Sequence, residues 1–190
     1  MQVLGKIDAH WTLFLDRDGV INQRYVDDYV KKADDFIFLN QAEYAIANLS
    51  KWFARIFVVT NQQGLGKGLM SEEDLNAIHT KMINAVQEVG GKIDAVYYCP
   101  DLKEQASFNR KPQGGMALKS KKAYTEIHFK QSVMVGDTFT DMLFGKRLGM
   151  LTVLIGSDPT ALKKAKYVDA RFDSLADFAQ YVDLKITKNE

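Results

Sequence analysis

Five short runs of β-forming residues alternate with longer segments of helical periodicity, and this alternation constrains the fold more than any other feature of the sequence. Four of the runs are almost entirely apolar, as is typical of strands covered on both faces of a parallel sheet. The predicted strands are Thr12–Leu15, Arg55–Thr60, Ala95–Tyr98, Ser132–Val135 and Thr152–Ile155.

Apolar residues recur every three or four positions between these runs. The clearest helical segments are Gln41–Phe53 and Ser71–Val89, the second of which starts with the capping-box spacing Ser71 to Asp74 and stops before two glycines. Further helices are predicted at Met116–Ile127, Thr138–Leu148, Pro159–Lys164 and Ser174–Tyr181. The alternation indicates an α/β fold with a mostly parallel sheet, whose ligand site lies beyond the carboxyl ends of the strands.

The composition predicts a single domain over residues 1–190, with about ten N-terminal and about five C-terminal residues peripheral to it. The 25 lysines and arginines nearly balance the 24 aspartates and glutamates, which argues against a nucleic-acid or membrane partner. The only cysteine, Cys99, rules out an intrachain disulfide framework, and we see no secretory leader and no spanning apolar run. We therefore expect a cytoplasmic monomer or weak dimer that acts on a small molecule.

Polar residues follow three of the predicted strands directly. Asp16-Arg17-Asp18-Gly19 follows the first strand, Thr60 to Gly64 end the second, and Gly136 to Asp141 follow the fourth. Because the carboxyl ends of parallel strands meet at one edge of a sheet, these groups are expected to converge.

Asp16 and Asp18 place two like charges at the end of a buried strand, which costs free energy unless a cation neutralises them. A site of carboxylate oxygens that also recruits Asp137 suits Mg²⁺, with Asp141 as a ligand or as a residue that orients water.

The same residues predict phosphoryl transfer through an aspartyl phosphate. In this hypothesis Asp16 attacks phosphorus, and Asp18 protonates the leaving oxygen and then activates water. Thr60 and Lys111 would stabilise the charge on the transferred group.

Four segments resemble, in order and spacing, the motifs of the haloacid dehalogenase-like phosphatases: DRDGVIN (16–22), VVTNQQG (58–64), RKP (110–112) and GDTFTD (136–141). More narrowly, they are similar to the branch of that family that acts on heptose bisphosphate or histidinol phosphate. The resemblance implies a Rossmann-like three-layer sandwich. It also implies a role for each site residue. Asp16 would be the nucleophile and Asp18 the general acid and base, and the phosphate or substrate ligands would be Thr60, Asn61, Arg110 and Lys111. Mg²⁺ would be held by Asp16, Asp137 and the main-chain carbonyl of Asp18, with Asp141 in support.

The gaps between the motifs are too short for a large cap domain, so we expect an open site. Relatives in this branch often hold a structural zinc before the RKP triplet. This chain has only Cys99 there, and one thiolate cannot build a tetrahedral Cys/His site, so no structural zinc is expected. Segment 101–109 must then be ordered by other contacts or close over substrate.

The substrate class stays open at this point. A small sugar phosphate or bisphosphate is favoured, with heptose bisphosphate first, histidinol phosphate as the nearest alternative, and a polynucleotide 3′-phosphate disfavoured by the near-neutral charge. An alternative from another class is a catalytically silent binding module that kept the scaffold.

Other residues are candidates for roles outside the reaction itself. Tyr25, Asp27 and Tyr29 are candidate substrate contacts, and Lys67 is a candidate ligand of a second phosphate. His79 lies in the middle of a predicted helix and is interpreted as a surface or interface residue.

Overall fold

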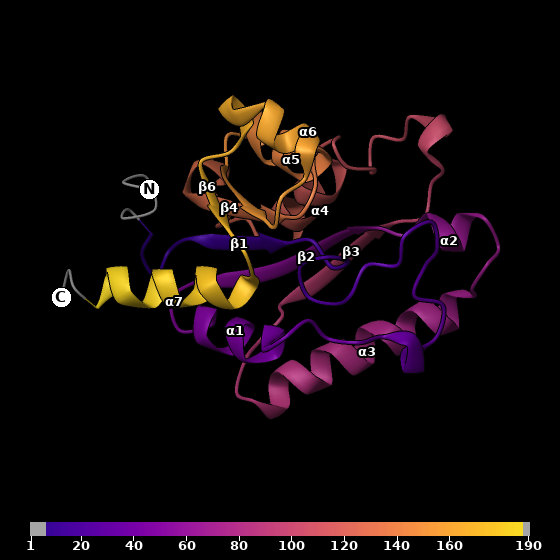
Figure 1. The fold of residues 1–190 in the computed structure, drawn as a ribbon, viewed down its shortest axis with the longest axis horizontal. Helices are drawn as coiled ribbons and strands as arrows, with labels where there is room; N and C mark the ends of the chain where they lie inside the picture. Colours follow the sequence, from indigo (N-terminus) through magenta and orange to yellow (C-terminus); the bar gives the residue numbers. More distant parts are fainter. Residues whose placement is uncertain (1–6, 188–190) are drawn as a thin grey trace.

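The computed structural model describes residues 7–187, which form one six-stranded parallel sheet in the order β3-β2-β1-β4-β5-β6 (Figure 1). The expectation of peripheral chain ends falls mostly on residues 1–6 and 188–190, which lie outside the described residues. The strands are β1 (Thr12–Leu15), β2 (Arg55–Asn61), β3 (Ala95–Cys99), β4 (Ser132–Gly136), β5 (Leu151–Ile155) and β6 (Ala170–Phe172).

Helices cover both faces of the sheet, so the molecule has three layers (Figure 1). One layer contains α1 (Ala42–Leu49), α3 (Glu72–Glu88) and α7 (Leu175–Ile186), and the other contains α4 (Gly115–Ala123), α5 (Phe139–Leu148) and α6 (Pro159–Lys163). The short helix α2 (Gln63–Gly66) follows β2, and 3-10 turns occur at Ala33–Asp35, Lys103–Gln105, Phe129–Gln131 and Ala165–Tyr167. The expected α/β sandwich with a parallel sheet is confirmed.

Successive residues of the central strand pack against opposite layers, because side chains alternate between the faces of a strand. Leu13 and Leu15 of β1 join the core that includes α1, α3 and α7, whereas Phe14 joins the core that includes α4 and α5. All three side chains are fully buried. This two-sided burial explains why the strand sequences are continuously apolar.

The five predicted strands are confirmed, but β6 was missed. It has only three residues, of which Ala170 alone is buried, so it gives neither an apolar run nor a clear alternation. Helix α1 ends at Leu49 rather than Phe53, because the next residues turn toward β2 with the N–H groups of Trp52 and Phe53 bonded to the Leu49 carbonyl. Helix α4 likewise ends before the prediction, and α7 runs beyond it to Ile186.

No cap domain interrupts the sheet within residues 7–187. The connection between β1 and α1 contains one 3-10 turn, and the connection between β2 and β3 contains α2 and α3. In the described part of the chain, no helix has the length and apolar character needed to cross a bilayer.

Candidate active site

The carboxyl ends of β1 and β2 open onto a cavity of about 500 Å³. Asp16 and Asp18 from the first motif line it, together with Thr60 and Asn61 from β2 and Asp141 from α5. Arg110 and Lys111 also line it, so the structure brings together most of the predicted site residues.

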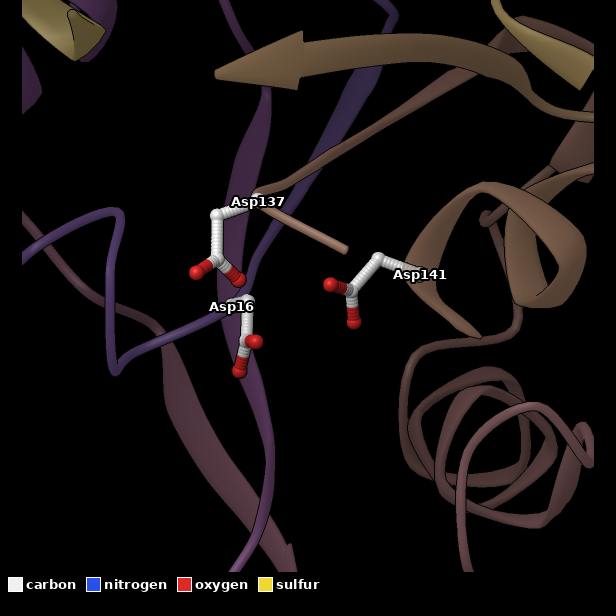
Figure 2. Close-up of side chains that lie close together, drawn as sticks. All are labelled: Asp16, Asp137 and Asp141. Atoms are coloured by element: carbon white, nitrogen blue, oxygen red, sulfur yellow. The ribbon is translucent and has the colours of Figure 1, made fainter. Parts of the chain in front are cut away.

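Three carboxylates from the first and fourth motifs converge at this edge of the sheet. Figure 2 shows the Asp16, Asp137 and Asp141 side chains close together, and one oxygen of each lies within 4.8 Å of those of the other two. Burial raises the pKa of Asp137 above its ordinary value, and the nearby charges of Asp16 and Asp141 raise it further. Burial also raises the pKa of Asp16, although Lys111 opposes this shift. The positive charges nearby therefore do not fully stabilise these carboxylates in their charged form.

Lys111 lies buried between two of these carboxylates. Its Nζ is 2.8 Å from Asp16 Oδ1 and 2.7 Å from Asp141 Oδ1. The Lys111 backbone is fixed by Asn61, whose side-chain amide accepts from Lys111 N–H and donates to Lys111 C=O, at 3.0 and 3.2 Å. Asn61 thus positions Lys111, and its predicted contact with substrate stays a prediction.

Asp141 uses its second oxygen to cap its own helix. Thr138 at the start of α5 donates to Asp141 Oδ2 through its backbone N–H and its hydroxyl, at 3.1 and 2.6 Å. Asp141 thus contacts Lys111 through Oδ1 and Thr138 through Oδ2, while its predicted supporting role stays a prediction.

Asp18 is held by three donors from two motifs. Arg17 donates to both of its oxygens at 3.0 and 3.1 Å, Asn22 donates to Oδ1 at 3.0 Å, and Gln62 donates to Oδ2 at 2.9 Å. Burial alone would raise the pKa of Asp18, but the Arg17 charge and these hydrogen bonds outweigh it, so the pKa lies below its ordinary value. Gln62 also donates to the Thr60 hydroxyl at 2.8 Å and so links the ends of β1 and β2.

Arg24 pairs with Asp137 on the open side of the cluster. Its Nη1 lies 2.7 Å from Asp137 Oδ2, and its side chain is 44% exposed. Burial works against the charged guanidinium, but Asp137 and the other carboxylates raise the pKa of Arg24 above its ordinary value.

Gly19 leaves the room that Asp137 occupies. Its φ is +89°, and a Cβ at this position would lie 2.0 Å from Asp137 Oδ2. A side chain here is thus excluded both by backbone conformation and by contact.

The donor set fits a divalent cation of the Mg²⁺ type. Carboxylate oxygens are its preferred ligands, and the buried Oδ1 of Asp137 accepts no hydrogen bond from the described residues. Burial and the neighbouring carboxylates raise the pKa values of Asp16 and Asp137, and a bound cation would stabilise both groups in their charged form.

The rim of the cavity is formed by two connections that Gln63 joins. Gln63 donates to the Tyr29 hydroxyl at 3.1 Å and accepts from Lys103 N–H at 2.9 Å, and all three residues line the cavity. Arg110 donates to the Asp101 carbonyl at 3.1 Å. Segment 101–109 is therefore held by hydrogen bonds to neighbouring residues, the first of the two expected alternatives. The buried thiol of Cys99 lies 3.4 Å from Asp101 Oδ2.

Not all of the other candidate substrate contacts line the main cavity. Tyr29 lines the main cavity, whereas Tyr25 lines a smaller one and donates to the Asp35 carbonyl. Asp27 is exposed and lines neither cavity, and the Lys67 ammonium lies 5.4 Å from the centre of the Tyr29 ring rather than in the cavity lining.

The interpretation of His79 as a surface or interface residue was wrong. It is buried within the chain, and its Nε2 lies 3.3 Å from Arg17 Nη1. Because a guanidinium has only donors, His79 accepts this bond in its neutral form. Burial lowers the pKa of His79 to about 3, and the Arg17 charge lowers it in the same direction.

Sequence reasoning missed four residues that bond to Asp18 or Asp137: Arg17, Asn22, Arg24 and Gln62. Three of them stand inside the motifs 16–22 and 58–64, so their place in a strand-end turn was the available signal. Arg24 lies outside every motif, and nothing in its spacing indicates the contact with Asp137.

Residues 13–188 match the protein family described as Polynucleotide kinase 3 phosphatase. Among curated proteins, the chain is 37% identical over 174 residues to the D-glycero-alpha-D-manno-heptose-1,7-bisphosphate 7-phosphatase of Mycobacterium bovis, covering 89% of this chain and 90% of the relative. It is 36% identical over 143 residues to the D-glycero-beta-D-manno-heptose-1,7-bisphosphate 7-phosphatase of Bordetella bronchiseptica, covering 75% and 79%.

Among solved structures, the D,D-heptose 1,7-bisphosphate phosphatase of B. bronchiseptica, complexed with magnesium and phosphate, superposes with a TM-score of 0.82. That match has 30% sequence identity and covers 92% of this chain and 99% of the other. Over 92% of its length, this chain therefore matches the fold of a protein crystallised with both a metal and an anion.

Proposed function

Because this chain belongs to the haloacid dehalogenase-like phosphatases, we propose that it is a Mg²⁺-dependent hydrolase of a small sugar bisphosphate. The single observation that carries the proposal is the convergence of the Asp16, Asp137 and Asp141 carboxylates beside the buried ammonium of Lys111, at the mouth of a cavity. Excess carboxylates together with one fixed cation suit the capture of a metal ion and a phosphate together.

Asp16 is the proposed nucleophile. Its Oδ1 accepts from the backbone N–H of Arg17 at 2.7 Å and lies 2.8 Å from Lys111 Nζ. These contacts fix the carboxylate and leave Oδ2 to attack phosphorus, so that a P–O bond to Asp16 forms as the bond to the sugar oxygen breaks.

Asp18 is the proposed general acid and base. Its pKa is low in the free site because of Arg17, Asn22 and Gln62. A phosphate dianion bound next to it repels its charge and so raises the pKa, which favours a protonated Asp18 in the complex. Asp18 then gives its proton to the leaving sugar oxygen and later removes a proton from the water that hydrolyses the aspartyl phosphate.

Mg²⁺ would be held by Asp16, Asp137 and the main-chain carbonyl of Asp18, and when bound it neutralises charge on the transferred phosphoryl group. Lys111 contributes a second positive charge from the protein, held in place by Asp141. Thr60, which also lines the cavity, offers its hydroxyl to a phosphoryl oxygen.

The relatives support a heptose 1,7-bisphosphate as substrate, since both curated relatives named above carry that name. They differ in the anomer, alpha in one and beta in the other, so both anomers belong in the test. The cavity is of a size that suits a phosphorylated sugar, and Lys103 and Arg110 on its rim provide positive charge away from Asp16.

The experiment is phosphate release from a panel of substrates, with Mg²⁺ and with excess chelator. The panel contains the two heptose 1,7-bisphosphate anomers, histidinol phosphate, a DNA strand with a 3′-phosphate and an aryl phosphate. We expect Mg²⁺-dependent turnover, fastest with a heptose bisphosphate. Absence of Mg²⁺-dependent turnover on every member would support the catalytically silent alternative.

A polynucleotide 3′-phosphate is the second candidate, because the matching family is described by that activity. The near balance of 25 basic and 24 acidic residues argues against it, since nucleic-acid binding rests on a positive surface. Preferential turnover of the DNA substrate, weakened steeply by salt, would overturn the sugar proposal.

We further propose that the protein acts in the cytoplasm as a monomer or weak dimer. The use of a single cysteine, present as a free thiol, supports a reducing compartment. Light scattering coupled to size-exclusion chromatography measures the oligomeric state, and a stable higher oligomer would contradict this assignment.

A further inference from the structure

Arg24 stands where three cavities meet. It lines the main cavity of about 500 Å³, a neighbouring one of about 610 Å³ that Asp137 also lines, and a small one of about 100 Å³ next to Asp18. A guanidinium at this junction borders both the carboxylate cluster and the main cavity.

Asp137 depends on Arg24 for compensation of its charge. Lys111 is already shared between Asp16 and Asp141, and the buried Arg17 pairs with Asp18. The ion pair that Asp137 forms within residues 7–187 is the one with Arg24, at 2.7 Å. Without it, a carboxylate with a buried and unbonded Oδ1 would face two other carboxylates.

A divalent cation and Arg24 compete for the same carboxylate. Both are positive, so each weakens the interaction of the other with Asp137. The Arg24 side chain is 44% exposed, and ion pairs of such exposure are weak, so an entering metal ion can displace it at small cost.

We propose that Arg24 is an internal counter-ion of the metal site. It neutralises Asp137 before the metal binds, is released by the metal, and then adds its positive charge to the phosphate-binding part of the main cavity. This inference rests on the proposed function, because it concerns the metal and phosphate of that same site.

The test is the Arg24→Gln variant, studied by calorimetric titration with Mg²⁺ in the absence of substrate. Removal of the competing charge is expected to tighten Mg²⁺ binding by roughly two- to fivefold, the range that corresponds to an exposed ion pair. The metal-free variant should melt at a lower temperature than the wild type, and Mg²⁺ should raise its melting temperature by more.

The matched control is Lys31→Gln. Lys31 lies on the same connection as Arg24 but pairs with Asp28, at 2.8 Å, away from the carboxylate cluster. The Mg²⁺ affinity of the Lys31→Gln variant should equal that of the wild type. Arg24→Lys keeps the charge and should lie between the wild type and Arg24→Gln. Equal Mg²⁺ affinities of Arg24→Gln and wild type, or equal tightening by Lys31→Gln, would overturn the proposal.

The second half of the proposal is tested with inorganic phosphate at saturating Mg²⁺. Arg24→Gln should bind phosphate more weakly than the wild type by roughly two- to fivefold. Unchanged phosphate affinity would overturn the transfer of Arg24 to the phosphate. Wild-type turnover in the panel above tests the proposed function separately, so an active wild type with an indifferent Arg24→Gln variant would refute this inference alone.

Discussion

Arg17 Nη1 lies 3.3 Å from His79 Nε2, although 62 positions separate the two residues in the sequence. This contact connects the turn that carries Asp16 and Asp18 to the middle of α3. Because Arg17 donates to both His79 and Asp18, the imidazole has to stay neutral for the arrangement to hold.

Acidification should therefore destabilise the protein through His79. The pKa of His79 falls from 6.5 to about 3 on folding, so between these values the unfolded chain binds the additional proton and stability is lost as pH decreases. The loss amounts to about 1.4 kcal/mol per pH unit at most. His79→Gln keeps an acceptor but does not titrate. Urea unfolding at a series of pH values within this window should show a shallower pH dependence for this variant, and parallel curves would contradict the assignment.

Asp16→Asn should abolish turnover while leaving the protein folded. The substitution removes the attacking carboxylate and keeps its shape, so we expect a loss of at least about 10³-fold in kcat. Circular dichroism checks the fold, and aryl phosphate hydrolysis measures the rate. A residual rate near that of the wild type would exclude a covalent route through Asp16.

Lys111→Met should destabilise the metal-free protein at neutral pH by about 3 kcal/mol, because it leaves Asp16 and Asp141 buried without their cation. Protonation of Asp16 relieves the repulsion, so the cost should shrink as pH falls. The control is Lys146→Met, which breaks a 2.6 Å pair with the partly exposed Asp169 and should cost about 1 kcal/mol or less. Urea unfolding with and without Mg²⁺ measures both, and equal costs would contradict the special position of Lys111.

Gly19→Ala should weaken Mg²⁺ binding by displacing Asp137, since the added Cβ would lie 2.0 Å from its Oδ2. We expect at least about a tenfold loss of Mg²⁺ affinity, equivalent to about 1.4 kcal/mol. Gly90→Ala is the matched control, because Gly90 also has a positive φ, +81°, but no atom lies within 4 Å of its added Cβ. That variant should lose about 1–2 kcal/mol of stability and no Mg²⁺ affinity.

Mg²⁺ affinity should rise with pH. Burial and mutual repulsion raise the pKa values of Asp137 and Asp16, so protons compete with the metal for both carboxylates. Calorimetric titrations in buffers of different ionisation enthalpy should reveal proton release on Mg²⁺ binding. Proton uptake, or no exchange at all, would contradict the raised values.

The sheet and the convergence of carboxylates at its edge could be predicted from the sequence for one physical reason. Strands buried on both faces are continuously apolar, so the first polar residues after them, such as Asp16 and Asp137, mark the carboxyl edge. Contacts between the strand-end residues and side chains of the irregular connections were not predictable in this way. Arg24 reaches Asp137 only because of the path of an irregular connection, and that path leaves no periodic signal.

His79 shows a signal that was present and misread. It stands four positions after Leu75 and one after Ile78, both fully buried on α3, so the helical period already placed it in the apolar stripe. Its polarity alone favours the surface, but its position in the stripe places it inside. A polar residue within such a stripe is better interpreted as a buried residue with a specific partner.

The carboxylate cluster and the rim of the cavity stand on different parts of the fold. Asp16, Asp18 and Asp137 stand on strand ends and their first turns, whereas Tyr29 and Lys103, which Gln63 joins, stand on surface connections. We expect substitutions in these connections to change which phosphate ester is accepted while leaving the carboxylate cluster in place. A new specificity would then need no added domain.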